Sequence, residues 1–225
     1  MNINYCLPII KNNKKDILQE ISENKKNYQY FEIWIDYIED LDKEFIEDLI
    51  ELVGNKLIFL FRRKNSEKSK LNFRDKLVIL SILKEFKVFV DLDININKKE
   101  IGYLELGKGK ILTIISYHNY KKTPTDRTLK SVVEKAKKKN PAIIKISTFC
   151  KGEFDALRLL MLQQELKKQK KKHIVLGMGK FGTITRVFGT LFGNEMIFAP
   201  VNIEEKSAEG QLTKKYLEKI FKALN

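Results

Sequence analysis

A lysine stands inside an apolar run of the chain, in the segment Pro141-Ala142-Ile143-Ile144-Lys145-Ile146-Ser147. Strand alternation places Lys145 on one face of that run with Ile143 and Ser147. A lysine near a strand end often extends its ammonium group to water. Burial instead disfavours the ammonium form and lowers the pKa of a lysine, which leaves a neutral amine that can attack a ketone and form a Schiff base. Lys145 is therefore the candidate nucleophile.

One of the two histidines, His118, lies at the end of another apolar run, in Ser116-Tyr117-His118-Asn119-Tyr120. A lone histidine at a strand end is more often a structural residue than a catalyst. If this strand is the neighbour of the one that carries Lys145, the two strand ends lie about 5 Å apart, and His118 can act as a base on a substrate bound to the lysine. His173 comes near the start of a later run, should face the opposite end, and receives no role.

Two later segments can hold an anion. In the segment from Leu176 to Arg186, glycines permit close approach of backbone N–H groups, and Arg186 can fork onto a carboxylate. The glycine spacing matches neither the dinucleotide fingerprint nor a P-loop, and an ordinary strand-to-helix turn explains it equally well. Ser207-Ala208-Glu209-Gly210-Gln211 is a polar loop that could fold over a site or be a plain surface turn.

The elements that position these residues follow from an alternation of short apolar runs with longer amphipathic stretches. We expect strands near Tyr5–Ile9, Tyr30–Ile35, Leu57–Phe61, Val88–Leu92, Ile111–Ile115, Ile143–Ile146, His173–Leu176 and Met196–Ala199. We expect helices over Lys14–Asn24, Lys43–Val53, Asn72–Glu85, Asp126–Lys138, Glu153–Gln169, Thr183–Leu191 and Thr213–Ala223.

Eight strand-then-helix units in 225 residues predict an α/β fold, a single-domain (β/α)8 TIM barrel over residues 1–225, since that fold usually takes about 250 residues. A doubly wound sheet, with five or six strands, fits less well. The segment 95–110 carries lysine, asparagine and glycine with a weak period, so the fourth helix should be short or irregular. In such a barrel the chemistry lies at the C-terminal ends of the strands.

The chain has 43 basic and 29 acidic residues and a formal net charge of +14, but only six of the basic residues are arginine. A nucleic-acid binder needs arginine and aromatic residues on one face, whereas the densest runs here are lysines at the ends of expected helices, where cations meet the helix dipole. No apolar run approaches the roughly 18 residues of a membrane span, and the first run is too short for a signal peptide. Cys6 and Cys150 lie far apart with no metal-ligand spacing. We expect a cytoplasmic protein with no metal, nucleic-acid or membrane partner.

Four segments, taken together, resemble the type I 3-dehydroquinate dehydratases. The resemblance covers most of the chain and is strongest over Ile111–Gln211. Ser116–Pro124 matches the pattern Ser-x-His-x-x-x-x-Thr-Pro, and Lys145 follows His118 at the family's own interval. Met178–Arg186 matches Met-Gly-x-x-Gly-x-x-(Ser/Thr)-Arg, and Ser207–Gln211 matches Ser-Ala-x-Gly-Gln.

The resemblance implies a cofactor-free dehydration of the small molecule 3-dehydroquinate to 3-dehydroshikimate, in the shikimate pathway, by a homodimer. It assigns the Schiff base to Lys145 and the acid and base roles to His118. It implies that Arg186, Ser207 and Gln211 hold the carboxylate and hydroxyls of the substrate, with the last loop as a lid. The family's substrate-binding glutamate and arginine match Glu32 and Arg62.

The chain departs from the family pattern in two places. Where the family has Glu-x-Arg-x-Asp, Trp34 replaces the arginine, so we expect the loss of a donor fork to the substrate and weaker substrate binding. Where a glutamate that partners the histidine should stand, the chain has Ser66, with Glu67 one residue late. We expect Glu67, or an acid from Asp91–Asp93, to take over that contact, or turnover to be slower.

Two other functions remain open on the residues. Another Schiff-base barrel, such as an aldolase, would keep Lys145 but would not need the loop Ser207–Gln211. A basic barrel that binds nucleic acid would show binding that weakens steeply as salt is raised.

Overall fold

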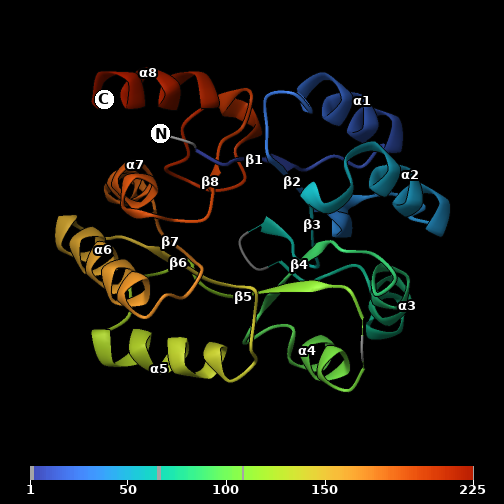
Figure 1. Cartoon of the computed structure of the whole chain (residues 1–225), viewed down its shortest axis with the longest axis horizontal. Coiled ribbons are helices and arrows are strands. Elements are labelled where there is room, and N and C mark those ends of the chain that lie inside the picture. Colours follow the sequence, from blue (N-terminus) through green and yellow to red (C-terminus); the bar gives the residue numbers. More distant parts are fainter. Residues whose placement is uncertain (1–2, 65–66, 108, 225) are drawn as a thin grey trace. The chain divides into compact units, whose positions relative to one another are not determined.

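The computed structural model describes residues 3–64, 67–107 and 109–224 as strands and helices in strict alternation (Figure 1). The chain divides into two compact units. One unit consists of residues Cys6–Ile114, and the other consists of residues up to Tyr5 together with Ile115 and all that follows. Within the described residues, no helix is long and apolar enough to cross a membrane.

The unit Cys6–Ile114 has a parallel sheet of neighbouring strands in the order β1 to β4, as continuous apolar runs predict. Its elements are β1 (Tyr5–Ile9), α1 (Lys14–Asn24), β2 (Tyr30–Trp34), η1 (Ile35–Tyr37), α2 (Lys43–Val53), η2 (Gly54–Lys56), β3 (Leu57–Leu60), α3 (Phe73–Leu83), β4 (Phe89–Asp93) and α4 (Lys98–Glu105). The register pairs Glu32 with Ile58 and Trp34 with Leu60. The backbone of β2 at Glu32 and Trp34 is therefore held in register with β3.

Short polar side chains start helices α1, α2 and α3 of this unit. Asn13 accepts hydrogen bonds from the backbone of α1, Asp42 does the same for α2, and Asn72 forms a reciprocal capping box with Asp75 at the start of α3. Each cap satisfies backbone N–H groups that would otherwise lack a partner, which stabilises a helix by about 1 kcal/mol. These caps end each strand-to-helix connection at a defined residue.

The second unit continues the alternation. Its elements are β5 (Leu112–Asn119), α5 (Asp126–Lys137), β6 (Ile143–Phe149), α6 (Glu153–Lys168), β7 (His173–Met178), η4 (Lys180–Gly182), α7 (Thr183–Phe192), β8 (Ile197–Phe198), η5 (Ile203–Glu205) and α8 (Lys214–Leu224). Strand β6 lies between β5 and β7, and its parallel register with β7 pairs Lys145 with Ile174. Helix α6 packs against β7 and α7, and Gln163 donates a 2.7 Å hydrogen bond to the carbonyl of Gly189 on α7.

The expected elements are all present, with boundaries that differ by a few residues. The fourth helix, α4, is short as expected, at eight residues, but regular. Strand β5 runs on to Asn119 and β6 to Phe149, both beyond their expected ends. Because polar residues fill those extensions, apolar periodicity could not show them. The extension of β5 places His118 on the strand itself.

Candidate active site

Lys145 lies in the middle of β6 and is buried, with 5 % of its surface exposed. Its Nζ atom is 4.2 Å from the centroid of the Phe198 ring on β8. This is a cation–π contact, which attracts the ammonium form, whereas the burial of the side chain reduces the solvation of that form. The alternative that Lys145 extends its side chain to water does not fit this burial.

His118 lies on β5, the strand beside β6. Its imidazole is partly exposed and stacks on Tyr120, with the ring centroids 6.0 Å apart and the planes inclined by 20°. The expectation that His118 and Lys145 come from neighbouring strands is therefore confirmed. His173, at the start of β7, is buried, and its Nδ1 atom is 2.6 Å from the carbonyl oxygen of Lys171. Burial lowers the pKa of His173, which suits a neutral structural residue.

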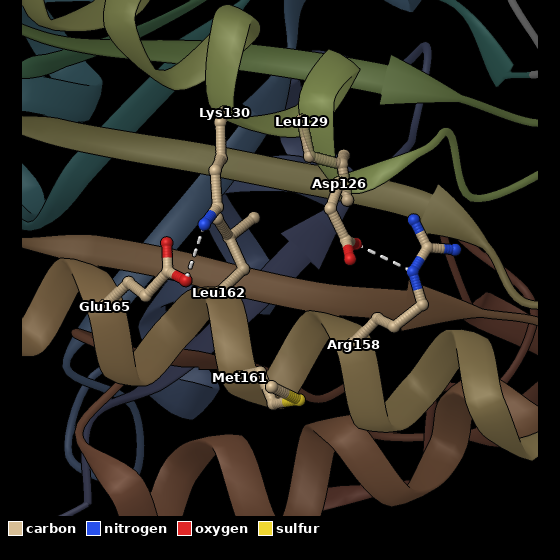
Figure 2. A pocket seen from close by; sticks show the side chains of 7 residues that line it. All are labelled: Asp126, Leu129, Lys130, Arg158, Met161, Leu162 and Glu165. Carbon is tan, nitrogen blue, oxygen red and sulfur yellow. Dashed lines mark hydrogen bonds and ion pairs between the residues drawn. The ribbon is translucent and has the colours of Figure 1, made fainter.

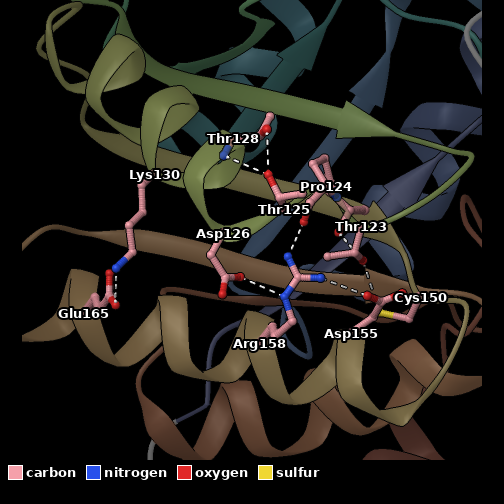
Figure 3. Close-up of polar contacts among 11 residues, drawn as sticks. Thr123, Pro124, Thr125, Asp126, Thr128, Lys130, Cys150, Asp155, Arg158 and Glu165 are labelled. Atoms are coloured by element: carbon pink, nitrogen blue, oxygen red, sulfur yellow. Dashed lines mark hydrogen bonds and ion pairs between the residues drawn. The ribbon is translucent and has the colours of Figure 1, made fainter.

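Thr123 fastens the loop that follows His118 to the strand that carries Lys145 (Figure 3). Its hydroxyl donates to the carbonyl of Phe149 at 3.0 Å and lies 2.9 Å from the hydroxyl of Thr148. Because the Thr123 hydroxyl has only one proton, Thr148 is then the donor to Thr123. Thr123 and Thr148 are both buried, so these hydrogen bonds do not compete with bulk water.

Arg158 on α6 fixes the far end of the same loop. It donates to Asp126 at 2.7 Å and Asp155 at 3.1 Å, and it also donates to the carbonyl of Pro124. Figure 3 shows this guanidinium reaching from α6 to the start of α5. The loop between β5 and α5 is thereby held at Thr123 and at Pro124.

A surface hollow lies between α5 and α6 (Figure 2). Leu129 and Leu162 are among the residues that line it. Two ion pairs cross it, Lys130 with Glu165 at 2.9 Å and Arg158 with Asp126 at 2.7 Å. The polar groups that line the hollow thus already bind one another, and the hollow contains none of the expected site residues.

The turn from β7 into α7 brings two backbone segments into close contact. A Cβ atom on Gly182 would lie 2.3 Å from the carbonyl carbon of Gly177, so only glycine fits there. The hydroxyl of Thr185 accepts from the N–H of Gly177 and donates to the carbonyl of Gly182, both at 2.7 Å. This packing sets the position of Arg186, the next residue on α7.

Arg186 is a buried cation with spare hydrogen-bonding capacity. It is 3 % exposed, and burial lowers the pKa of its guanidinium to about 10, which still leaves it charged at neutral pH. Its Nη2 atom donates to the carbonyl of Glu209 at 3.3 Å, whereas its Nε has no hydrogen-bond partner within the described residues. A buried donor without a partner is costly, and an anion would satisfy it.

The loop Ser207–Gln211 closes on that same turn. The Gln211 side chain is buried and accepts from the N–H of Ser207 at 2.7 Å, while its amide donates to the Ser207 hydroxyl at 2.9 Å. Gly210 has φ +80°, and a Cβ there would lie 2.6 Å from the carbonyl oxygen of Gly179. The structure therefore brings Arg186, Ser207 and Gln211 into one cluster.

Glu32 and Arg62 come together in the other unit, around Trp34. Glu32 and Arg62 are 2 % and 6 % exposed. The indole N–H of Trp34 donates to Glu32 at 2.9 Å, and the guanidinium carbon of Arg62 is 5.8 Å from the centroid of the Trp34 ring. Arg62 also forms a loose ion pair with Asp91, with Nη2 and Oδ2 3.9 Å apart.

A model of the type I 3-dehydroquinase family matches residues 5–225. The chain belongs to this family. Its 3-dehydroquinate dehydratase relative in Methanococcus maripaludis (strain C6 / ATCC BAA-1332) is 32 % identical over 225 residues, which cover 97 % of this chain and 99 % of the relative. The relative in Clostridioides difficile (strain 630) is 29 % identical over 236 residues, with 98 % and 91 % covered.

Solved structures of the family show the fold. The 3-dehydroquinate dehydratase from Geobacillus kaustophilus HTA426 superposes with a TM-score of 0.85 at 22 % identity, and covers 100 % of this chain and 91 % of its own. A type I enzyme from Clostridium difficile, with covalently modified comenic acid, has a TM-score of 0.81 at 26 % identity, with 99 % and 92 % covered. The expected (β/α)8 TIM-barrel fold and the expected family of carbon–oxygen lyases are thus confirmed.

The histidine's expected acidic partner stays a prediction. Ser66, at the family's glutamate position, lies outside the described residues. Glu67 is mostly exposed and pairs with Arg63 at 3.3 Å, and Asp93 accepts from the backbone N–H groups of Asn95 and Ile96. These contacts engage Glu67 and Asp93 within their own segments.

Sequence reasoning missed three residues that organise the site. Thr123 and Arg158 hold the loop after His118, and Asp36 accepts hydrogen bonds from the segment Ser69–Leu71 that follows Arg62. The Thr-Pro ending of the histidine motif was a signal for Thr123. Asp36 stands at the aspartate position of the pattern Glu-x-Arg-x-Asp, which was a signal for it. Arg158 contacts Asp126, 32 residues away in the chain, and no local pattern indicates it.

The described residues contain no group of three or more histidine, cysteine, aspartate or glutamate side chains that could hold a metal ion. Cys6 and Cys150 are both buried. Burial also raises the pKa of the Cys150 thiol, which disfavours the reactive thiolate form.

Proposed function

We propose that this member of the family dehydrates 3-dehydroquinate to 3-dehydroshikimate through a Schiff base on Lys145. The observation that carries the proposal is the burial of Lys145 on β6, against the ring of Phe198 and on the strand next to the one that carries His118. The amine attacks the ring ketone and water leaves, which forms an iminium. The iminium withdraws electrons and so acidifies the adjacent C–H bond.

His118 carries the proton in this proposal. It takes the proton from the carbon next to the iminium and then gives it to the departing hydroxyl, which leaves as water. An imidazole suits both roles because its protonation changes near neutral pH. Water then hydrolyses the imine and frees Lys145. The net change is the loss of one water molecule, so no oxidant, reductant or cofactor is needed.

Arg186, Ser207 and Gln211 would hold the substrate's carboxylate and hydroxyls. The charge of Arg186 and its Nε without a partner support this assignment, because a carboxylate would form a charge-assisted hydrogen bond there. The loop Ser207–Gln211 would open and close as a lid. Glu32 and Arg62 would contact ring hydroxyls, and residues 1–225 would act as one catalytic domain.

The test of the function is the absorbance of the conjugated enone that dehydration creates. Purified protein with 3-dehydroquinate should show this absorbance without any added cofactor, and equally in the presence of a chelator. A protein that is folded by circular dichroism yet produces no enone would contradict the proposed function.

The role of Thr123 leads to a prediction about turnover. Replacing Thr123 by valine keeps the shape and removes the hydroxyl contacts with Thr148, Phe149 and Cys150, so the loop after His118 loosens. We expect kcat to fall by about tenfold, because small displacements of a catalytic group are costly, while KM changes by less than about twofold. Thr123→Ser should restore most of the rate, since it restores the hydroxyl.

Thr128→Val is the matched control for that prediction. Thr128 contacts Thr125 at the exposed start of α5, so its kcat should equal that of the wild type within about twofold. A Thr123→Val variant with wild-type kcat would show that the anchor at Thr123 does not position His118.

We also propose that the chain forms a homodimer through the outer faces of α6 and α7. These neighbouring helices expose apolar side chains at helical spacing, namely Phe154, Leu157 and Met161 on α6 and Ile184, Phe188 and Phe192 on α7. From their exposed fractions, the six side chains present about 600 Å² of apolar surface, against the roughly 800 Å² per partner that a standard interface buries.

Replacing both Leu157 and Met161 by glutamate should convert the dimer to a monomer, because it would bury four charges in a symmetric interface. Light scattering at micromolar concentration measures the mass. Leu106→Glu is the control, since Leu106 is 91 % exposed at the end of α4, and it should leave the dimer intact. A monomeric wild type, or a double variant that remains dimeric, would contradict this interface.

We expect the protein to bind its small-molecule substrate and to bind neither nucleic acid nor a membrane. The buried thiols of Cys6 and Cys150 suit a reducing compartment, and we propose the cytoplasm.

A further inference from the structure

Trp34 occupies the position where the family pattern has an arginine, and its indole makes a defined contact. Its N–H donates to a carboxylate oxygen of Glu32 at 2.9 Å. The two residues are separated by one position on β2, so they share a face of the strand. Both are buried, with 4 % and 2 % of their surfaces exposed. A buried indole N–H that donates to a carboxylate forms one of the stronger kinds of hydrogen bond.

The other surroundings of the indole hold it in one orientation. The Arg62 guanidinium lies within cation–π range of the ring, at 5.8 Å from its centroid. The Tyr37 ring packs against it at 6.2 Å between centroids, with the planes inclined by 60°. Register with β3 fixes the backbone, since Trp34 pairs with Leu60. The indole N–H of Trp34, which donates to Glu32, is therefore held in one orientation.

A tryptophan differs from an arginine at this position in charge as well as in shape. An arginine would bring a cation with up to five N–H donors, which would partly neutralise Glu32. The indole supplies one donor and no charge. The indole therefore fixes the orientation of the Glu32 carboxylate through one directed hydrogen bond, and an oriented carboxylate accepts strongly from a hydroxyl group. The expected loss of a donor fork to the substrate stays a prediction, because the indole N–H donates to Glu32.

We propose that Trp34 is a positioning residue, which holds the Glu32 carboxylate in the orientation that receives a ring hydroxyl of the substrate. The inference rests on the proposed function, in which Glu32 binds 3-dehydroquinate. In this proposal the indole N–H of Trp34, a neutral donor, acts on the substrate only through Glu32. An arginine at the same position would instead bring a cation that touches the substrate directly.

Replacing Trp34 by phenylalanine removes the N–H and keeps an aromatic ring. We expect KM for 3-dehydroquinate to rise by about tenfold, as the loss of one charge-assisted hydrogen bond gives, with kcat within about twofold of the wild type. Tyr37→Phe is the matched control, because it removes a polar group from the same aromatic cluster, the hydroxyl that accepts from the N–H of Lys64. Its KM should change by less than about twofold.

A double-mutant cycle separates positioning from simple packing. In a Glu32→Ala background, Trp34→Phe should change KM by less than about twofold, because the group through which Trp34 acts is gone. If Trp34 only supported the fold, its replacement would raise KM equally in both backgrounds and would lower kcat as well. Equal effects in the two backgrounds would overturn the inference.

Fluorescence gives a second, independent measurement. Trp34 is the only tryptophan in the sequence, so all indole emission reports on this contact. In a Lys145→Ala variant, which should bind substrate without turning it over, 3-dehydroquinate should change the emission along a saturable curve. Adding Glu32→Ala should remove that change.

The outcomes distinguish the inference from the function on which it rests. Absence of enone production by the wild type would contradict the proposed function. A wild type that produces enone, together with a Trp34→Phe variant of unchanged KM or an emission that does not respond to substrate, would overturn the role of Trp34 alone.

Discussion

Replacing Lys145 by methionine should lower kcat for 3-dehydroquinate by about 10⁴-fold or more, since it removes the amine that forms the iminium in the proposed mechanism. Methionine matches the lysine in length and apolar volume, so the buried site on β6 stays filled. The measurement is enone production by single-wavelength absorbance, with thermal unfolding as the check that the variant is folded.

Lys130→Met is the control for that variant, because Lys130 is an exposed residue that pairs with Glu165 across the hollow between α5 and α6. Exposed ion pairs contribute little to stability, so this variant should keep wild-type kcat. A folded Lys145→Met variant that retains more than about one per cent of the wild-type kcat would contradict nucleophilic catalysis by Lys145.

Replacing His118 by alanine should lower kcat by about 10²-fold or more, the usual cost of losing a general acid–base group. The Schiff base should still form, because the amine of Lys145 is intact. Proton removal from the iminium becomes slow, so the covalent intermediate accumulates. Borohydride reduction should therefore trap at least as much adduct in this variant as in the wild type.

His173→Asn is the matched control for His118. His173 lies buried at the start of β7, and its ring nitrogen contacts a backbone carbonyl, so its replacement should affect stability and leave kcat within about twofold. Normal turnover in His118→Ala would remove the histidine from the mechanism. A variant that forms no adduct would mean that His118 acts before the chemical step assigned to it.

Apolar periodicity predicted the order of strands and helices well, because continuous apolar runs are what buried parallel strands require. It failed at the carboxyl ends of β5 and β6, where the strands continue into Ser116–Asn119 and Ser147–Phe149. All but Phe149 of these residues carry a polar group, and His118 of the candidate site lies in the first of the two segments. The rule that hydrophobic runs mark strands fails where polar residues continue a strand.

The candidate site likewise contains residues that the sequence indicates and contacts that it does not. Lys145 could be proposed because it is an unusual residue in an apolar run, His118 because it stands at the end of one, and Arg186 because it follows a glycine turn. The contact of Trp34 with Glu32 and the anchor formed by Thr123 and Arg158 could not be found from spacing. The contact of Trp34 with Glu32 depends on side-chain orientation, although the two residues are neighbours on one face of β2. The anchor formed by Thr123 and Arg158 depends on packing between elements far apart in the chain, which a local pattern does not encode.

The contact between Trp34 and Glu32 also changes what the departure from the family pattern means. Sequence reasoning treats the missing arginine as a lost donor and expects weaker binding. The structure supplies an indole N–H to the same glutamate, so the position loses charge and keeps one directed hydrogen bond.

The central claim is a covalent bond between Lys145 and the substrate's ketone carbon. Incubation of the wild type with 3-dehydroquinate and borohydride, followed by proteolysis and mass spectrometry, tests it directly. We expect one modified peptide, the one that contains Lys145, and a loss of activity in proportion to the modification. An enzyme that stays active and unmodified under these conditions, or that carries the adduct on a different lysine, would contradict it.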